Sequence, residues 1–216
     1  MNPKERIARR VAKEFKPGNI VNLGIGLPTL VANYVPKDMN IFFHGENGVL
    51  GIGSEVPEEL SNPDLTNAGG KFIETVPGAM TFDTVFSFAL IRGGHLDYTV
   101  LGGLQVDEEG HLANWMVPGK LIPGMGGAMD LVTGAKKVIV AMTHTAKGRP
   151  KIVKKCNLPL TSSRRIDLIV TEYAVIKPTD EGLVLQEIAP DITLEELKEI
   201  TEADLIIPED LKTMEV

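Results

Sequence analysis

The chain has 216 residues, of which 43% are hydrophobic, 24% charged and 5% aromatic. This composition is too apolar for a disordered chain, and no uncharged apolar run is long enough to cross a membrane. The net charge of −7 argues against a nucleic-acid-binding surface. The single cysteine, Cys156, excludes an internal disulfide, and together with four histidines it leaves no cluster that predicts a metal site.

The N-terminal segment predicts an amphipathic helix rather than a targeting sequence. Apolar residues recur every four positions within residues 3–16, and Pro17-Gly18 gives a stop signal. Two acidic residues, Glu5 and Glu14, do not fit the acid-poor composition of a transit peptide. We therefore expect a cytoplasmic protein.

The next segments alternate short apolar strands with helices. Continuous apolar runs predict strands at residues 20–23, 41–43, 98–101, 138–142 and 166–170. Helices are predicted from Pro28 to about Val35, from an N-cap at Thr81 to Arg92, and after Thr193, where a capping box begins. Antiparallel pairs are predicted within residues 105–113 and between residues 173–176 and 183–188.

This order of elements indicates an α/β fold. We expect a three-layer α/β/α sandwich around a mixed, mainly parallel sheet. No linker, low-complexity run or internal repeat divides the chain, so residues 1–216 are expected to form a single domain. In such sheets a ligand site is expected beyond the carboxyl ends of the strands.

Glycine is concentrated in the apolar part of the chain. All but two of the 22 glycines lie within residues 18–134, where they indicate tight turns or backbone that comes close to a ligand. Two clusters are residues 22–28, with Gly24 and Gly26, and residues 124–130, with Gly126 and Gly127. Backbone N–H groups of such loops can bind an anion, a thioester carbonyl or an oxyanion. Each cluster alone is also compatible with a tight turn or a helix start.

Glu46 is the main candidate for a catalytic residue. It follows an apolar strand and lies between Gly45 and Asn47-Gly48, which leave its surroundings open to a large substrate. The strand presents this carboxylate at the carboxyl edge of the sheet. The alternative is that Asn47-Gly48 forms an ordinary turn and Glu46 is an exposed residue beside it.

The segment from Phe43 to Gly48 resembles the catalytic Ser-Glu-Asn-Gly motif of family I CoA-transferases, in their β subunit. Gly45 stands where that family usually has serine, which puts in doubt any contact that the serine hydroxyl makes. The resemblance covers essentially the whole chain, because further family segments recur in the same order at residues 22–28, 67–71, 91–95, 112–115, 119–120, 124–131 and 158–161.

The resemblance implies an enzyme that moves CoA between a short-chain acyl-CoA and a small carboxylic acid, such as acetoacetate, acetate or butyrate. By this resemblance Glu46 attacks the acyl-CoA and forms a glutamyl-CoA thioester in a ping-pong reaction. Asn22 and the Gly127 N–H are candidate oxyanion donors, and Lys71 is a candidate partner for a substrate carboxylate. The expected chemistry uses CoA as a substrate and needs no metal or other cofactor.

The resemblance also implies a partner. The β chain in this family either pairs with a separate α subunit or is fused to one, and for this chain an α2β2 heterotetramer is expected. The Gly-Gly-Phe signature of the α half does not occur in this sequence. We therefore expect the isolated chain to have little or no activity.

The basic run from Lys147 to Lys155 stands out in an acidic protein. A solvated helix face is the preferred interpretation, and a contact with the phosphates of CoA is the alternative. The four histidines have no mutual spacing that predicts a triad or a metal site, and they receive no catalytic role.

Two other functions remain open from the residues alone. In the first, the chain is a sugar-phosphate isomerase or deaminase on a similar fold, and Glu46 is a base that abstracts a proton. In the second, the chain is a non-catalytic module that binds CoA or a nucleotide through the same glycine loops, and this binding survives the loss of Glu46.

Overall fold

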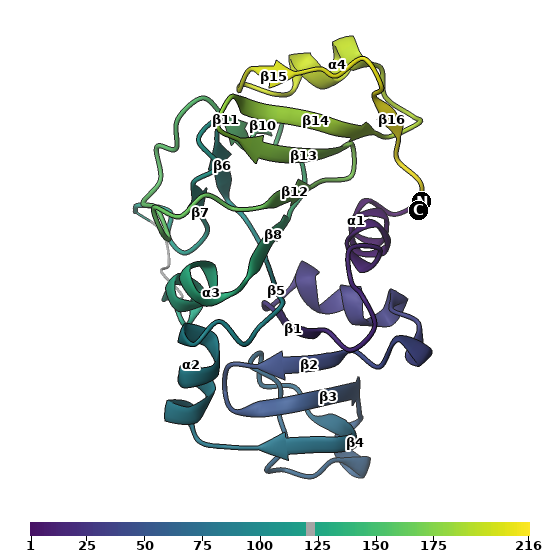
Figure 1. The fold of residues 1–216 in the computed structure, drawn as a ribbon, viewed down its shortest axis with the longest axis vertical. Coiled ribbons are helices and arrows are strands. Elements are labelled where there is room, and N and C mark those ends of the chain that lie inside the picture. Colours follow the sequence, from purple (N-terminus) through teal and green to yellow (C-terminus); the bar gives the residue numbers. More distant parts are fainter. Residues whose placement is uncertain (120–123) are drawn as a thin grey trace.

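The computed structural model describes residues 1–119 and 124–216, so Lys120 of the Gly119-Lys120 motif lies outside the described residues. Within them the chain forms an 11-stranded sheet with the order β15-β14-β13-β12-β8-β5-β1-β2-β3-β4, and β16 pairs with β14 (Figure 1). The strands are β1 (Ile20–Leu23), β2 (Phe42–Gly45), β3 (Val49–Glu55), β4 (Ile73–Thr81), β5 (Tyr98–Leu101), β8 (Lys137–Ala141), β12 (Leu168–Val170), β13 (Ala174–Thr179), β14 (Gly182–Ile188), β15 (Leu205–Ile206) and β16 (Lys212–Thr213).

The centre of this sheet is parallel. Strands β2, β1, β5, β8 and β12 run in the same direction, whereas β3 and β4 on one side and β13 on the other are antiparallel to their neighbours. The carboxyl ends of β1, β2 and β5 therefore meet at one edge of the sheet. This arrangement confirms the predicted mixed, mainly parallel sheet.

Side chains of the central strands alternate between two apolar layers, because successive residues of a strand point to opposite faces. In β8, Val138 and Val140 belong to one buried cluster, and Ile139 and Ala141 belong to the other. Helix α1 (Pro3–Ala12) and the 3-10 helix η1 (Leu27–Tyr34) cover the second face.

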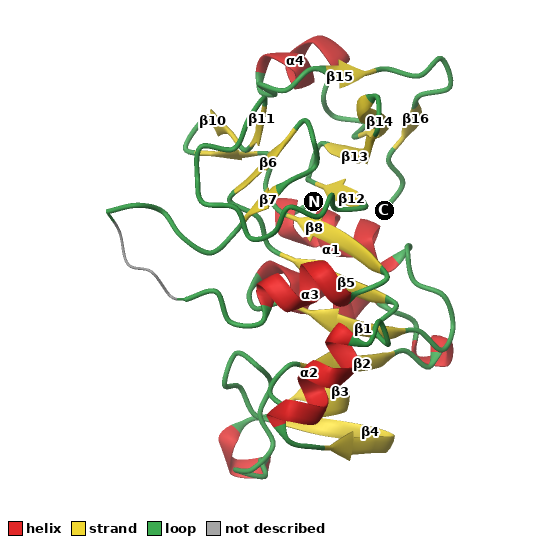
Figure 2. Ribbon diagram, turned by 60° about the vertical axis from the view of Figure 1, so that its left-hand side comes forward, coloured by secondary structure: helices red, strands yellow, loops and turns green. Residues whose placement is uncertain are grey.

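The first face is covered by three helices and a small sheet, which completes the three-layer α/β/α sandwich. Figure 2 shows α2 and α3 side by side on this face. The elements are α2 (Thr84–Arg92), α3 (Ala128–Gly134), α4 (Leu194–Glu199), and the sheet formed by β6 (Gln105–Asp107), β7 (Leu112–Ala113) and β11 (Ile152–Val153). The remaining short elements are η2 (Lys37–Met39), η3 (Glu58–Leu60), β9 (Thr145–Ala146) and β10 (Arg149–Pro150).

Most of the predicted elements are present, with shifted bounds in several. Strands β1 and β5 have the predicted limits, and the predicted antiparallel pairs are β6 with β7 and β13 with β14. Helix α1 ends at Ala12 rather than residue 16, although Phe15 is buried in the same cluster. The helix predicted after Pro28 is a 3-10 helix, in which the Thr29 N–H donates to the carbonyl oxygen of Gly26.

The prediction that Thr81 caps a helix is wrong. Thr81 is the last residue of β4, where it pairs with Val49 of β3, and the side chain of Asp83 caps α2 by accepting a hydrogen bond from the Phe86 N–H at 2.8 Å. Strands β3 and β4 themselves were not predicted. Their glycines and Pro77 interrupt the apolar pattern, and the pairing between them has two register shifts.

The basic run from Lys147 to Lys155 does not form the predicted helix. It contains the turn of the β9–β10 hairpin and strand β11. Lys147 and Gly148 have φ values of 51° and 73°, and a two-residue hairpin turn favours positive φ at both central positions. The basic side chains therefore do not share a helix face.

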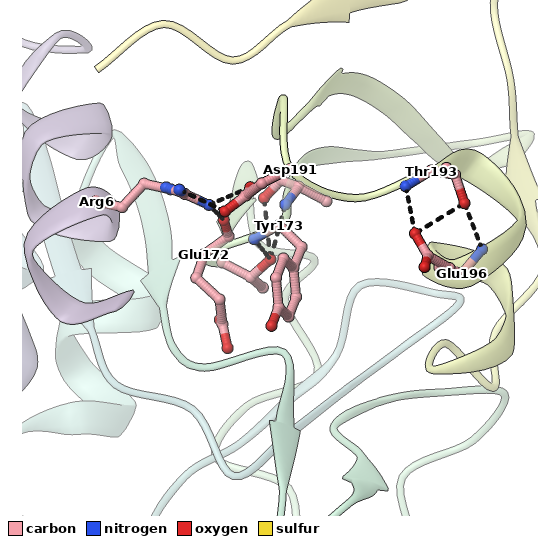
Figure 3. Close-up of polar contacts among 8 residues, drawn as sticks. Arg6, Glu172, Tyr173, Asp191, Thr193 and Glu196 are labelled. Carbon is pink, nitrogen blue, oxygen red and sulfur yellow. Dashed lines mark hydrogen bonds and ion pairs between the residues drawn. The ribbon is translucent and has the colours of Figure 1, made fainter. Parts of the chain in front are cut away.

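Polar contacts join helix α1 to the C-terminal part of the chain (Figure 3). The Arg6 guanidinium of α1 donates to both carboxylate oxygens of Asp191, at 2.6 and 2.8 Å, and to the carbonyl oxygen of Glu172 at 3.1 Å. Beyond Asp191, Thr193 and Glu196 form the predicted capping box at the start of α4. The bidentate pair of Arg6 and Asp191 holds α1 against the C-terminal part of the chain.

Candidate active site

A cavity of about 480 Å³ lies at the carboxyl ends of β1, β2 and β5. This is the edge at which an open parallel sheet is expected to bind its ligand. Glycine-rich segments form much of its wall. The lining residues are Asn22–Ile25, Glu46, Ala68, Leu101–Leu104, Asn114, Gly124–Ala128 and Leu131.

Glu46 reaches this cavity from the first position after β2, where it is half-buried. The N–H of Gly127, at the start of α3, donates to Glu46 Oε1 at 3.3 Å. No ion pair among the described residues includes the Glu46 carboxylate. A carboxylate that faces a cavity without a paired cation keeps its oxygens available for a substrate carbon.

The loop before α3 approaches Glu46 so closely that it requires glycine. A Cβ atom at Gly126, which has a φ of 54°, would lie 3.2 Å from Glu46 Oε1. A Cβ atom at Gly127 would overlap Glu46 Oε2 and lie 3.2 Å from the Phe88 ring. The structure thus brings together the predicted catalytic carboxylate and two of the predicted binding residues, Gly126 and Gly127, from segments about 80 residues apart in sequence.

Asn22 and Gly24 line the same cavity, but both are engaged by neighbouring strands. The Asn22 amide group is buried and donates to the carbonyl oxygen of His44 at 3.1 Å. The N–H of Gly24 donates to the carbonyl oxygen of Val100 at 2.8 Å, and a Cβ atom at Gly24 would lie 3.1 Å from that oxygen. Close packing against β5 is therefore sufficient to explain this glycine.

The other two predicted binding residues do not line the cavity of Glu46. Gly26 precedes η1 with a φ of 91°, and a Cβ atom there would meet open space. Lys71 lines a second cavity of about 320 Å³, which shares Leu23, Ile25 and Ala68 with the first. Its ammonium group lies 2.8 Å from Glu55 Oε2, so the residue predicted to bind a substrate carboxylate is paired with a carboxylate of the chain.

A set of buried polar side chains is linked by hydrogen bonds to Glu46, and three of them, His44, Thr99 and Ser87, were not predicted to belong to the site. Asn22 pairs in register with His44 of β2 and Thr99 of β5, so the three side chains form a row across the sheet on the face covered by α2. All three are buried, as is Ser87 of α2. The signal in the sequence is a single polar residue within each of three otherwise apolar strands.

These side chains form a continuous set of hydrogen bonds. Thr99 Oγ1 donates to Asn22 Oδ1 at 3.1 Å, and His44 Nε2 lies 3.1 Å from Ser87 Oγ. Ser87 Oγ donates to the backbone carbonyl oxygen of Glu46 at 2.8 Å. Burial lowers the pKa of His44 to about 4, so its ring is neutral at pH 7.

Gly45 precedes Glu46, where the resembled family has serine. A Cβ atom at this position would lie 2.6 Å from Asn47 Oδ1 and 3.0 Å from the end of the Ile52 side chain. The Asn47 amide donates to the carbonyl oxygen of Thr66 at 2.7 Å. A side chain at position 45 therefore requires Asn47 to move, and with it a contact that holds the loop before β4.

Residues 1–119 and 124–216 contain neither a candidate metal site nor a helix that could span a membrane. No group of three or more His, Cys, Asp or Glu side chains in this part of the chain could hold a metal ion. No helix in the same part is long and apolar enough to cross a membrane.

Comparison with known proteins gives the same family as the motifs. The model of the coenzyme A transferase family matches residues 4–199. The β subunit of an acetate CoA-transferase of Haemophilus influenzae is 58% identical over 217 residues, which cover 100% of this chain and 97% of the relative. A subunit of a succinyl-CoA:3-ketoacid coenzyme A transferase of Helicobacter pylori is 52% identical over 202 residues, which cover 93% of this chain and 97% of the relative.

A solved structure has the same fold. The apoenzyme of an acyl-CoA transferase from Escherichia coli O157:H7 aligns with 99% of this chain at a TM-score of 0.78 and 23% identity. This chain spans 43% of the length of that transferase. The family model and the two relatives extend over nearly all of the sequence, and they show that the chain belongs to the coenzyme A transferase family, as a counterpart of its β subunits.

Proposed function

We propose that this chain carries the catalytic glutamate of a CoA-transferase that moves CoA between a short-chain acyl-CoA and a small carboxylic acid. The single observation that carries the proposal is the position of Glu46, which is half-buried in a cavity opposite the Gly127 N–H. The names of the relatives, which specify acetate and a 3-ketoacid, support small acids as substrates. The 11-stranded sheet takes strands from both ends of the chain, which supports one domain over residues 1–216.

The proposed reaction exchanges acyl groups without any change in oxidation state. A Glu46 oxygen attacks the thioester carbon and the carbon–sulfur bond breaks. CoA leaves as a thiolate, and the acyl group remains on Glu46 as a mixed anhydride. The thiolate then attacks the Glu46 carbonyl carbon, releases the first carboxylate, and forms a glutamyl-CoA thioester. The acceptor carboxylate attacks the Glu46 carbonyl carbon of this thioester, the carbon–sulfur bond breaks, and the CoA thiolate leaves behind a second mixed anhydride. The thiolate then attacks the acyl carbon of this anhydride, which gives the new acyl-CoA and the free Glu46 carboxylate.

The Gly127 N–H is the proposed oxyanion donor. It already donates to Glu46 Oε1, the oxygen that carries negative charge when the thiolate adds to the Glu46 carbonyl carbon. A fixed backbone donor at that oxygen stabilises the tetrahedral intermediate without reorganisation. The Asn22 amide is bound to His44 in this conformation, so its proposed part in oxyanion binding requires that this hydrogen bond be exchanged for one to the substrate.

Lys71 is proposed to bind the carboxylate of the acid substrate. It lines the cavity that adjoins that of Glu46, and its pair with Glu55 is exposed on both sides. Exposed pairs of this kind contribute about 0–1 kcal/mol, so a substrate carboxylate can replace Glu55 at little cost.

We propose that the chain works with an α subunit in an α2β2 heterotetramer in the cytoplasm. The relatives named as β subunits support a partner. Val85 and Phe86 of α2 and Met129 of α3 are 80%, 51% and 50% exposed, and α2 packs against α3, which begins at Gly127. Exposed apolar side chains on two helices that pack together support the docking of a second subunit on this face.

Covalent trapping tests the proposal. The chain, co-purified with its α subunit, is incubated with an acyl-CoA and hydroxylamine, and peptides are analysed by mass spectrometry. We expect a hydroxamate on Glu46, ping-pong kinetics, and loss of both in the Glu46→Gln variant. Glu55→Gln, a second glutamate near the site, is the matched control and should keep the label on Glu46. Turnover without any adduct on Glu46 would refute the proposal and favour use of Glu46 as a base.

A further inference from the structure

We propose that His44 is a positioning residue that acts through Ser87 to fix the peptide carbonyl of Glu46, and thereby the direction of the Glu46 carboxylate. This inference rests on the proposed function of Glu46. The contacts that carry it are His44 Nε2 to Ser87 Oγ at 3.1 Å and Ser87 Oγ to the Glu46 carbonyl oxygen at 2.8 Å.

The hydrogen atoms of this relay can be assigned from the partners. A carbonyl oxygen only accepts, so the single hydroxyl hydrogen of Ser87 is directed to Glu46. Ser87 Oγ must then accept from His44, which places the ring proton on Nε2. His44 Nδ1 is left as an acceptor and faces the Asn22 amide nitrogen at 3.4 Å.

The hydrogen-bond directions around Asn22, at the other end of the network, are also determined by the partners. The Asn22 amide nitrogen donates to the His44 carbonyl oxygen at 3.1 Å, and Thr99 donates to the Asn22 carbonyl oxygen at 3.1 Å. No buried side-chain nitrogen or oxygen among the described residues is left without a partner. The network therefore accepts only one tautomer of His44, and it has a single direction that ends at Glu46.

The turn around Glu46 is closed by the Gly48 N–H, which donates to the carbonyl oxygen of Gly45 at 3.0 Å, whereas the carbonyl of Glu46 itself is held by the hydroxyl of Ser87. Gly45 precedes Glu46, and Gly48, with a φ of 112°, follows it after one exposed residue. Glycine gives the backbone more freedom than any other residue. Ser87 belongs to α2 and is fully buried, so it is a fixed point from which the carbonyl of Glu46 can be held.

His144 offers a matched comparison within the chain. It is also fully buried, and its ring nitrogens lie 3.0 Å from Thr171 Oγ1 and 2.9 Å from Thr201 Oγ1. None of these partners lines the cavity of Glu46. Loss of the His144 ring therefore tests what a purely structural buried histidine contributes.

The experiment compares steady-state kinetics and melting temperature of the αβ complex for wild type, His44→Leu, His44→Gln, Ser87→Ala and His144→Leu. We expect His44→Leu to lower kcat by on the order of 10- to 100-fold with little change in either KM, because misplacement of a nucleophile acts on the chemical step. His44→Gln keeps a donor for Ser87 and should recover most of kcat. His144→Leu should lower the melting temperature and leave kcat unchanged.

A double variant separates a relay from two independent effects. If His44 acts through Ser87, His44→Leu combined with Ser87→Ala should lose no more kcat than the worse single variant. Independent losses that multiply would overturn the inference, as would a His44→Leu kcat within about twofold of wild type. If His44→Leu does not fold, Ser87→Ala, which removes only a hydroxyl, decides alone: a wild-type kcat overturns the inference. An active wild type that depends on Glu46 keeps the proposed function intact whichever result is found.

Discussion

Two buried histidines should make the stability of the chain fall as the pH is lowered. Burial lowers the pKa of His44 to about 4, and burial together with the nearby charge of Lys151 lowers the pKa of His144 to about 4. In the unfolded chain both pKa values return to about 6.5. Below pH 6.5 the unfolded chain binds protons that the native chain does not bind, so the free energy of unfolding decreases with decreasing pH.

The size of this effect follows from the two pKa values. The difference between about 6.5 and about 4 corresponds to a limit of about 3.4 kcal/mol per histidine, which is lost in full only below pH 4. Between pH 7 and pH 5 each histidine loses about 2 kcal/mol, and the two together about 4 kcal/mol. This is a large part of the 5–15 kcal/mol that is typical for a native domain.

Urea unfolding at pH 7 and pH 5 measures the effect in the purified chain. The His144→Gln variant lacks one of the two buried rings, so its loss of unfolding free energy between these pH values should be about 2 kcal/mol smaller than that of wild type. The two proteins differ only at position 144, so the comparison isolates the contribution of the His144 ring. His95→Gln removes an exposed histidine and is the control. An equal loss in wild type and His144→Gln would refute the reasoning.

Three substitutions near the cavity have defined expected outcomes. Gly127→Ala places a Cβ atom on the Glu46 carboxylate, so we expect at least about a 100-fold loss of kcat with an unchanged circular dichroism spectrum. Lys71→Ala should raise the KM of the acid substrate and leave that of the acyl-CoA unchanged in initial-rate kinetics. Gly45→Ser displaces Asn47, so thermal unfolding should show a loss of about 1 kcal/mol, and an unchanged melting temperature would contradict the packing argument.

The sequence predicted the central strands and the antiparallel pair of β13 and β14, but not the antiparallel pair of β3 and β4 at the other side of the sheet. Ile20–Leu23 and Tyr98–Leu101 are short apolar runs that are buried in a parallel sheet, and their limits were predicted correctly. Strand Val49–Glu55 contains two glycines, and Ile73–Thr81 contains Pro77-Gly78. These residues are typical of turns, and they are tolerated here because the pairing of the two strands contains irregular registers at the edge of the sheet.

The candidate site was predicted where local sequence is sufficient and missed where contacts depend on strand register. Glu46 and Gly127 could be selected from local glycine context, and the structure places them within hydrogen-bond distance. His44, Thr99 and Ser87 could not be connected in this way. Their contacts depend on the register of three parallel strands and on which turn of α2 faces the sheet, and neither is encoded by local spacing.

The glycines around Glu46 and the buried row of Asn22, His44 and Thr99 meet two different needs of the proposed nucleophile. Glycine at positions 126 and 127 lets the backbone reach the carboxylate, whereas Gly45 and Gly48 close a tight turn around Glu46, in which the Gly48 N–H donates to the carbonyl oxygen of Gly45. A nucleophile needs a fixed direction, and we propose that His44 and Ser87, which lie outside the loop, provide it for Glu46. Strand register supplies Asn22, His44 and Thr99 as a fully paired set, so rigidity comes from the sheet while the cavity itself stays open to a large substrate.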